Sequence, residues 1–538
     1  MRRTEETGMN THILDAHYPR LVRDYILDKG GARSFFRFSP DMKGVMECIE
    51  VRKESSVSEN LYTILKRQNS KHGADQRAME NIEHLREPGC ATVVTGQQIG
   101  LFGGPLYVTY KILKTLHTAD AVRESSSRPV VPVFWIGTND HDAEEISHAA
   151  FFDRGSSLRQ LRYETDSDPG LSCGRIPVGP SLQELVREFA GNIRTTEFTQ
   201  EIVTILSESY SDGKNLGSAF FDLAVRLYSR LGIVILDPSD KEFMNLIRPV
   251  LEKECGEFAS VSEKVFTETA EKVSAERYHV QVNPERGRLH AFLDDNGIRK
   301  PLFYDNGKVR DGKGNRIDSV NSRLSTHVLS RNLCQDYVLN TAAYVAGPGE
   351  ISYCALLRDL YEMHGLIMPV ILPRYMGTLV DRSVQRSLKA LKTGVEHFIL
   401  NPHDRAVHEI FSDETDIDFS ALRQDFEERA DRFTEEILKR LPGESGQEDY
   451  SNVSSLNKMI KSQLNRISGT VRKREKKRAE TDLRRASEAS DMLLPGGNLQ
   501  ERVLNIFQFM NFYGGAGFVE ELSGLIRGSE EGHTVWNI

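Results

Sequence analysis

Residues 91–136 contain the pattern of a strand, a glycine-rich loop, a helix and a second strand, and this succession restricts the fold most strongly. The run 91–95 (ATVVT) is β-rich, and residues 105–117 place apolar side chains at helical spacing. Residues 130–136 form a continuous apolar run, as expected of a strand covered on both faces of a parallel sheet. This βαβ unit predicts an α/β chain with a Rossmann-like, doubly wound parallel sheet.

The rest of the chain extends this core and adds two other kinds of segment. Apolar runs at 232–236 and 366–372 would join the same sheet. Residues 278–318 alternate apolar and polar side chains around hairpin-turn signals, which predicts a small antiparallel β insertion, either with a chemical role or as an excursion without one. The predicted organisation is a disordered start at 1–12, a Rossmann-like core with inserted segments at 13–415, a coiled-coil arm at 416–489 and a C-terminal helical segment returning to the core at 490–538.

The predicted arm has apolar residues at heptad-like spacing on both sides of a Leu441-Pro442-Gly443 stop. These residues are Phe419, Leu422, Phe426, Phe433 and Ile437, followed by Val453, Leu456, Ile460, Ile467 and Val471. We interpret the two helices as an antiparallel hairpin whose narrow apolar seam mediates homodimerisation. The basic run 471–485 is interpreted as a solvated face, with nucleic-acid binding as the less favoured alternative.

Composition excludes several classes of protein. The 69 basic and 78 acidic residues give a net charge of −9, which argues against broad capture of nucleic acid or anionic lipid. No apolar stretch approaches the roughly 20 residues of a membrane helix, and no secretory h-region follows the basic N-terminus. The six cysteines are scattered without a C-x-x-C pair. We therefore expect a cytoplasmic protein with neither nucleic-acid nor membrane partners.

The loop after the first strand is a candidate anion site, because glycines permit close backbone approach and a helix N-terminus carries positive potential. Tyr107 and Lys111, four residues apart, share one face of the following helix. The alternative is a tight turn whose glycines only permit helix–sheet packing. No Walker A or GxGxxG motif occurs in this loop, which disfavours a P-loop. The predicted substrate-binding residues are Thr95, Gly96, Gln97, Gln98, Gly100, Gly104, Pro105, Tyr107 and Lys111.

The second strand runs into Asn139, Asp140, His141 and Asp142 at the same predicted sheet edge. We predict that Asn139 contacts substrate and that the other three are catalytic. Carboxylates beside an imidazole can raise its pKa and make it a proton carrier, and an amine that attacks an acyl group must lose a proton. The alternatives are a divalent metal site, or an acidic helix N-cap and first turn.

A third strand–turn–helix segment, 341–357, repeats this arrangement. It predicts that Gly347, Gly349, Glu350 and Tyr353 lie at the sheet edge and bind substrate. Arg374 follows the apolar run 366–372 and is either a cation for a dicarboxylate or a structural arginine.

Four motifs together resemble the cysteine ligases of bacillithiol biosynthesis, the BshC family. They are TGQQIGLFGGPLY, VPVFWIGTNDHDAEEI, YVAGPGEISY and LPGGNLQERVLNIFQFMNFYG, in the family's order. The resemblance implies a Rossmann-like core, a coiled-coil arm used for dimerisation, and formation of an amide between cysteine and glucosaminyl malate as the last step of the pathway. The family commonly has E-D-H-D where this chain has Asn139 as the first residue, which puts the role of that missing acid in doubt.

Activation of cysteine has no sequence signature here. ATP or another acyl-activating nucleotide is the natural reagent, yet the chain has neither a P-loop nor the H-I-G-H and K-M-S-K-S signatures, so we assign no cofactor. Gln500, Glu501 and Arg502 are candidates for a second nucleotide site, or for capping the last helix. Two other functions stay open: a sugar- or nucleotide-binding assembly protein, and a metal-dependent hydrolase using the Asp140 cluster.

Overall fold

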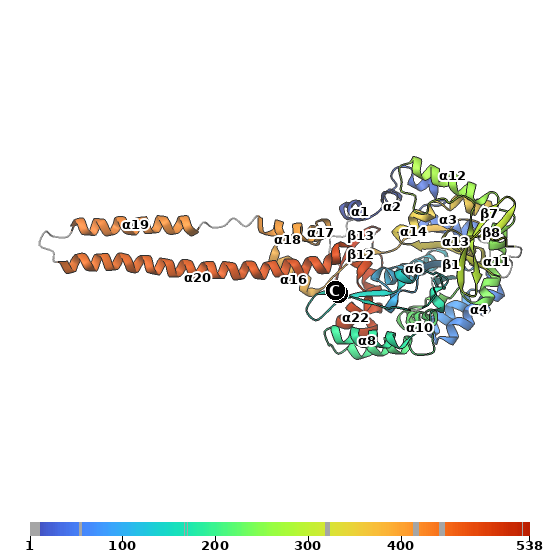
Figure 1. The fold of residues 1–538 in the computed structure, drawn as a ribbon, viewed down its shortest axis with the longest axis horizontal. Helices are drawn as coiled ribbons and strands as arrows, with labels where there is room; N and C mark the ends of the chain where they lie inside the picture. Colours follow the sequence, from blue (N-terminus) through green and yellow to red (C-terminus); the bar gives the residue numbers. More distant parts are fainter. Residues whose placement is uncertain are drawn as a thin grey trace. The chain divides into compact units, whose positions relative to one another are not determined.

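A computed structural model describes residues 11–52, 56–165, 167–168, 170–317, 323–412, 419–440, 447–529 and 531–538. The chain divides into a core unit, Met1–Val380 with Asn498–Ile538, and a helical unit, Asp381–Gly497 (Figure 1). The predicted disordered start, 1–12, lies outside the described residues except for its last two, where α1 (Thr11–His17) begins.

The core unit is built around a five-stranded parallel sheet in the order β11–β10–β1–β2–β5. The bounds in that order are Val370–Pro373, Thr341–Ala346, Ala91–Gln97, Val130–Ile136 and Val234–Leu236. All seven residues of β2 are buried, as its unbroken apolar run requires. The predicted doubly wound Rossmann-like fold is confirmed. Strands β5 and β11 begin at residues 234 and 370, later than the predicted runs, and turns with glycines at positive φ, Gly232 and Gly365, precede them.

Helices surround this sheet. Helix α6 (Leu106–Ser126) packs against β1, β2 and β10, and it runs beyond His117 because Ala119 and Val122 continue its buried side. Other helices of the core unit are α2 (Arg20–Ile26), α3 (Met42–Val51), α4 (Glu59–Lys71), α5 (Gln76–His84), α7 (Ala143–Ile146), α8 (Pro180–Asn192), α9 (Thr199–Ser209), α10 (Leu216–Tyr228), α11 (Lys241–Cys255), α12 (Ser262–Ala275), α13 (Val328–Val338), α14 (Pro348–Cys354) and α15 (Arg358–Met363).

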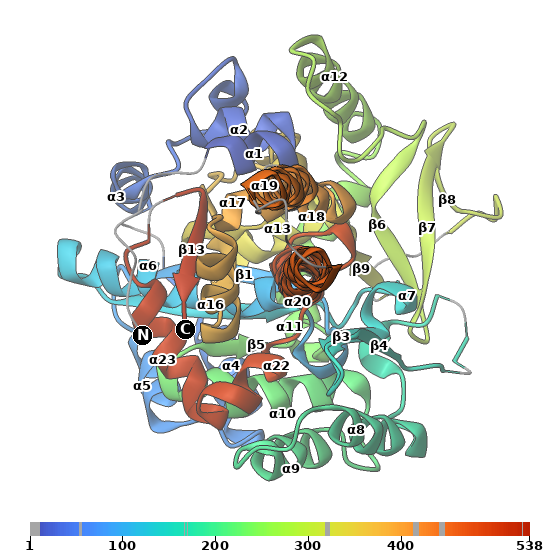
Figure 2. The same ribbon diagram turned by 90° about the vertical axis from the view of Figure 1, so that its left-hand side faces the viewer.

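The predicted β insertion forms an antiparallel sheet in the order β8–β7–β6–β9, and β6 to β8 lie side by side in Figure 2. The strands are β6 (Arg288–Asp295), β7 (Ile298–Asp305), β8 (Lys308–Asp311) and β9 (Leu324–Thr326). The Asn-Gly turns at 296–297 and 306–307 have positive φ at both residues, as two-residue hairpin turns require. The last strand, β9, lies beyond the predicted boundary at residue 318.

Two strand pairs were not predicted. A hairpin joins β3 (His148–Phe152) to β4 (Leu158–Arg162), and β12 (Met376–Val380) pairs in parallel with β13 (His533–Asn537) near the C-terminus. Between β12 and β13 in the core unit lie α21 (Gln500–Val503), α22 (Ile506–Tyr513) and α23 (Phe518–Ile526).

The helical unit contains the predicted antiparallel pair, α19 (Phe419–Arg440) and α20 (Gln447–Leu493). Asp431 on α19 accepts a hydrogen bond from Asn457 at 2.7 Å and pairs with Lys461, both on α20. The predicted stop at 441–443 lies outside the described residues. The unit also includes α16 (Arg382–Leu391), α17 (Val395–Leu400) and α18 (His403–Ser412), which pack on α20. Among the helices described, none is both long and apolar enough for a membrane span.

Candidate active site

A cavity of about 570 Å³ lies at the carboxyl ends of the core strands. It is lined by residues that follow β1, β2, β10 and β11, so it sits where the strand order reverses between β1 and β10. Open α/β sheets bind ligands at such a switch point, because the loops after the two neighbouring strands diverge there. The volume falls within the range of ligand sites.

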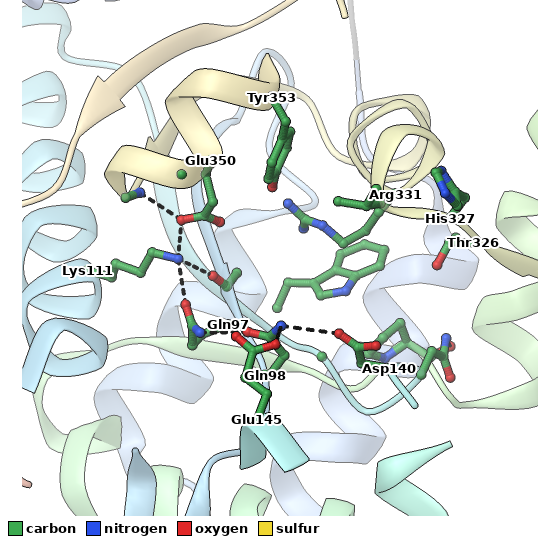
Figure 3. A pocket seen from close by; sticks show the side chains of 18 of the residues that line it. Gln97, Gln98, Lys111, Asp140, Glu145, Thr326, His327, Arg331, Glu350 and Tyr353 are labelled. Atoms are coloured by element: carbon green, nitrogen blue, oxygen red, sulfur yellow. Dashed lines mark hydrogen bonds and ion pairs between the residues drawn. The ribbon is translucent and has the colours of Figure 1, made fainter. Parts of the chain in front are cut away.

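One wall of the cavity contains a buried ion pair between Lys111 on α6 and Glu350 on α14 (Figure 3). The Lys111 ammonium also donates to the Gly96 carbonyl at 2.6 Å and to Gln97 Oε1 at 2.8 Å. An ammonium has three N–H donors, and these three acceptors occupy all of them. Although burial raises the pKa of Glu350, Lys111 and the hydroxyl of Tyr344 hold it below its usual range. The Lys111 ammonium therefore holds Glu350, Gln97 and the Gly96 backbone together in this wall of the cavity.

Two glutamines connect this ion pair to carboxylates beyond β2 (Figure 3). Gln97 Nε2 donates to Gln98 Oε1 at 2.8 Å. Gln98 Nε2 in turn donates to Glu145 Oε2 at 2.8 Å and to Asp140 Oδ2 at 3.2 Å. Partial burial and the nearby charge of Asp140 raise the pKa of Glu145. A carboxylate with a raised pKa is suited to accepting a proton near neutral pH.

Arg331 on α13 is a second cation at the cavity, and its hydrogen-bond partners differ from those of Lys111. Its Nη2 donates to the Tyr344 hydroxyl at 2.6 Å, and its Nη1 donates to Gln335 Oε1 at 3.2 Å. The guanidinium lies 5.7 Å from the centroid of the Trp135 ring. Burial raises the pKa of Tyr344 well above its usual value, so that phenol is neutral. Within the described residues, no carboxylate lies at ion-pair distance from Arg331; the charge of Glu350 acts on it through the Tyr344 hydroxyl, which donates to Glu350 Oε1 at 2.6 Å.

The β insertion forms another part of the cavity wall. Arg299 on β7 stacks over Phe292 on β6, with 4.1 Å between the guanidinium carbon and the ring centroid. Its Nη1 lies 3.1 Å from His141 Nδ1 and 3.6 Å from Asp140 Oδ1. The insertion therefore contributes side chains to the cavity wall, and whether it also has a chemical role stays a prediction.

Arg374 lines the cavity but forms a buried ion pair. Its Nη2 donates to Glu501 Oε1 at 2.7 Å, and both side chains are at most 4% exposed. The second oxygen of Glu501 accepts from the Gly377 backbone at 2.7 Å. Gln500 bonds both backbone polar groups of Leu379 on β12. Gln500 and Glu501 are thus fully buried residues that bond the backbone of Leu379 and Gly377 in β12 and lie outside the cavity, whereas Arg502 is exposed and lines it.

Most predicted site residues converge on this cavity. Those lining it are Gly96, Gln97, Gln98, Tyr107, Lys111, Asn139, Asp140, His141, Gly347, Gly349, Glu350, Tyr353, Arg374 and Arg502. Those outside it are Thr95, Gly100, Gly104, Pro105, Asp142, Gln500 and Glu501. Their chemical roles stay predictions.

The predicted anion site at the start of α6 is closed by the C-terminal segment. The Leu106 N–H donates to the Leu504 carbonyl at 2.9 Å, and Asn505 Nδ2 donates to the Gly104 carbonyl at 2.9 Å. Gly104, at φ +76°, makes the tight turn that brings these groups together. The Leu106 N–H of the helix N-terminus is therefore taken by a protein carbonyl, and Gly100, Gly104 and Pro105 lie outside the cavity. Thr95 is fully buried and donates to the Val345 carbonyl.

The Asp140 cluster also differs from expectation. Asp142 caps α7 by accepting from the Glu145 N–H at 3.1 Å, as the N-cap alternative predicted. The expected increase in the pKa of His141 is wrong: burial and the charge of Arg299 lower it. No group of three His, Cys, Asp or Glu side chains in the described part of the chain has the geometry to hold a metal ion.

Several cavity residues were missed from the sequence. They are Trp135, Glu145, Phe292, Arg299, Thr326, His327 and Arg331. Trp135 and Glu145 flank predicted site residues, and their closeness to the strand end was the available signal. The others come from the insertion and from α13, where nothing in the local sequence separates them from structural residues.

Comparison with known proteins gives two family matches. Residues 9–375 match the model described as "Bacillithiol biosynthesis BshC, N-terminal Rossmann-like domain", and residues 377–538 match the "C-terminal coiled-coil domain" of the same description. A Salinibacter ruber protein named "Putative cysteine ligase BshC" is 30% identical over 96% of both chains. Proteins of the same name from Chlorobaculum tepidum (31% identical over 89% of this chain and 88% of the relative) and Carboxydothermus hydrogenoformans (28% identical over 94% and 95%) are also similar.

Proposed function

Because this chain belongs to the BshC family, we propose that it is a ligase that joins cysteine to the amine of glucosaminyl malate in bacillithiol biosynthesis. One observation carries the proposal: a single cavity presents Arg331, a cation that forms no ion pair with a carboxylate of the described residues, and a coupled pair of carboxylates, Asp140 and Glu145. The substrate carries the complementary groups, since malate is anionic and the amine must lose a proton.

In the proposed reaction, the amine nitrogen attacks the acyl carbon of an activated cysteine. The new C–N bond forms as the leaving group departs with its electron pair, and the amine proton passes to Glu145 or Asp140. The raised pKa of Glu145 favours it as the acceptor. Arg331 would bind a malate carboxylate, because a guanidinium matches a carboxylate with two parallel hydrogen bonds. ATP or a related nucleotide would supply the leaving group.

The direct test incubates the full chain with glucosaminyl malate, cysteine and ATP and follows the thiol product by mass spectrometry. We expect Glu145→Gln to lower kcat by about 10²–10⁴-fold, the usual contribution of general base catalysis. Glu144→Gln is the matched control, because it makes the same substitution at a neighbouring exposed carboxylate that pairs with Arg162 and lies outside the cavity. Absence of product with ATP and with other acyl-activating nucleotides would contradict the ligase and favour a binding protein.

We also propose that the protein is a homodimer formed through α19 and α20. Phe426, Phe433 and Ile467 are each more than half exposed on these helices. A second copy of the same apolar surface would cover them, as in coiled-coil assemblies. Phe426→Ser with Phe433→Ser should shift the mass measured by light scattering from dimer to monomer, whereas Glu435→Gln on the same helix should leave it dimeric. A dimer that persists in the double variant would contradict this surface.

A further inference from the structure

The contact between Arg299 and His141 determines where the imidazole carries its proton. A guanidinium has only N–H donors, so the histidine nitrogen that faces it must act as the acceptor. That nitrogen is Nδ1, 3.1 Å from Arg299 Nη1. A neutral imidazole with a bare Nδ1 has its proton on Nε2. Burial lowers the pKa of Arg299 to about 10, which still leaves the guanidinium protonated at neutral pH.

The surroundings hold both partners in place. The Arg299 side chain is 6% exposed, stacks on Phe292 and donates from Nη2 to the Thr326 carbonyl. The His141 ring makes an edge contact with Phe292, with 5.6 Å between ring centroids. Both neighbours in this contact therefore belong to the β insertion.

The nearby carboxylate does not reverse this assignment. Asp140 Oδ1 lies 3.7 Å from His141 Nδ1, beyond hydrogen-bond distance, and instead accepts from the His141 backbone N–H at 2.7 Å. The charged groups that act on the ring are Arg299, Asp140, Asp142 and Arg288. Burial and the arginines outweigh the carboxylates and lower the pKa of His141, which favours the neutral form.

We propose that His141 works as a neutral Nε2–H tautomer fixed by Arg299, and that it donates a hydrogen bond to the acyl oxygen rather than accepting the amine proton. The proposal rests on the proposed ligase function. As the amine attacks, the carbonyl electron pair moves onto the acyl oxygen, where the Nε2–H stabilises the developing charge. His141 neither gains nor loses a proton, and the amine proton goes to the carboxylates. Neutral imidazoles act in this way in other enzymes.

The tautomer can be measured without substrate, by ¹⁵N–¹H correlation spectra of the histidine-labelled full chain. His141, assigned from the signal lost in His141→Gln, should show a protonated Nε2 and a bare Nδ1 at pH 7. Arg299→Met should raise the histidine pKa and mix the tautomers, while Arg299→Lys, which keeps a cationic donor, should preserve the wild-type pattern. A wild-type imidazolium or an Nδ1–H tautomer at pH 7 would overturn the assignment.

Kinetics test the role. The amide nitrogen of a glutamine at position 141 can occupy the place of Nε2–H, whereas alanine removes the donor. We expect His141→Ala to lower kcat about 10²–10³-fold, as loss of an oxyanion donor does. The kcat of His141→Gln should stay within about tenfold of wild type. Its kcat/KM should still fall at acidic pH as in wild type, since the base is a carboxylate. If glutamine is as damaging as alanine, the donor role is wrong. Absence of turnover in wild type would refute the ligase proposal and leave the tautomer result intact.

Discussion

The cations on two sides of the cavity differ in how their charge is compensated. On the side of α6 and β11, Lys111 and Arg374 each form a buried ion pair with a carboxylate of the chain itself. On the side of α13, Arg331 is bonded to phenol and amide groups. A partly buried cation with no carboxylate at ion-pair distance among the described residues loses hydration in the free protein, and an anionic ligand offsets that cost. We therefore expect Lys111 and Arg374 to support the structure and Arg331 to bind substrate.

The largest effect should come from breaking an internal pair. Glu501→Gln leaves the buried Arg374 without its carboxylate, and removal of one partner of such a pair costs about 3–5 kcal/mol. The measurement is urea unfolding followed by tryptophan fluorescence, because Trp135 and Trp536 both lie in the core unit. Glu362→Gln, which breaks an exposed ion pair with Arg358, should leave the unfolding midpoint nearly unchanged. Equal midpoints in both variants would mean that the Arg374 pair is not a dry interior contact.

A second prediction concerns pH. Burial lowers the pKa of His533 to about 4, and Tyr18 joins this histidine to Glu501. Between pH 6.5 and 4 the unfolded chain binds a proton that the folded chain does not, so stability falls as pH falls, by up to about 3 kcal/mol. His117, whose pKa is also lowered to about 4, acts in the same direction.

Unfolding free energies of wild type and His533→Gln across this range separate the two histidines. In His533→Gln, the unfolding free energy should depend less on pH, and the dependence that remains should be the part due to His117. If the substitution leaves the pH dependence of the unfolding free energy unchanged, water reaches the region around Glu501. The two sides of the cavity would then differ less in burial.

The sequence predicts the sheet better than it predicts the site. Strand β2 matches its predicted bounds, because a run that is apolar at every position fits a parallel strand covered on both faces. The pair β12–β13 could not be foreseen, because it joins segments about 150 residues apart. The same long-range pairing changes the surroundings of Gly104: the local pattern fits an anion site, and only the return of Leu504 and Asn505 brings protein groups against it.

Whether a charged side chain can bind a ligand, or is already paired within the protein, also could not be predicted from the sequence. Lys111 and Arg374 follow strand ends, which made them good candidates from position alone. Whether Glu350 and Glu501 neutralise them depends on packing between distant segments. Arg331 lies inside a helix without a motif, so no local signal distinguished it. The position of a residue relative to a predicted strand end can indicate that it lies near a cavity. Whether its charge is already paired depends on residues that are distant in the sequence.

A third prediction addresses Arg331 itself. Arg331→Gln should raise the KM for glucosaminyl malate about 10–100-fold, the range of a hydrogen bond to a charged group, with little loss of stability. Arg331→Lys keeps the charge but loses the two-pronged donor geometry, so its KM should fall between the two. Binding of methyl glucosaminide, which lacks carboxylates, is the ligand control and should not change. A wild-type KM in Arg331→Gln would place the malate carboxylates elsewhere.

The smallest effect is expected at Arg502, which lines the cavity but is exposed. Solvent and salt screen an exposed charge, so Arg502→Gln should change KM only about two- to threefold at low ionic strength, and the difference should vanish near 0.5 M salt. The Arg331 variant should keep most of its defect at that salt concentration, because its guanidinium is packed among aromatic rings. Steady-state kinetics at both ionic strengths make the distinction. If salt reduces the KM defects of the two variants equally, burial does not distinguish Arg331 from an exposed cation at the cavity edge. The difference between them would then rest only on whether a carboxylate of the chain already pairs with the cation.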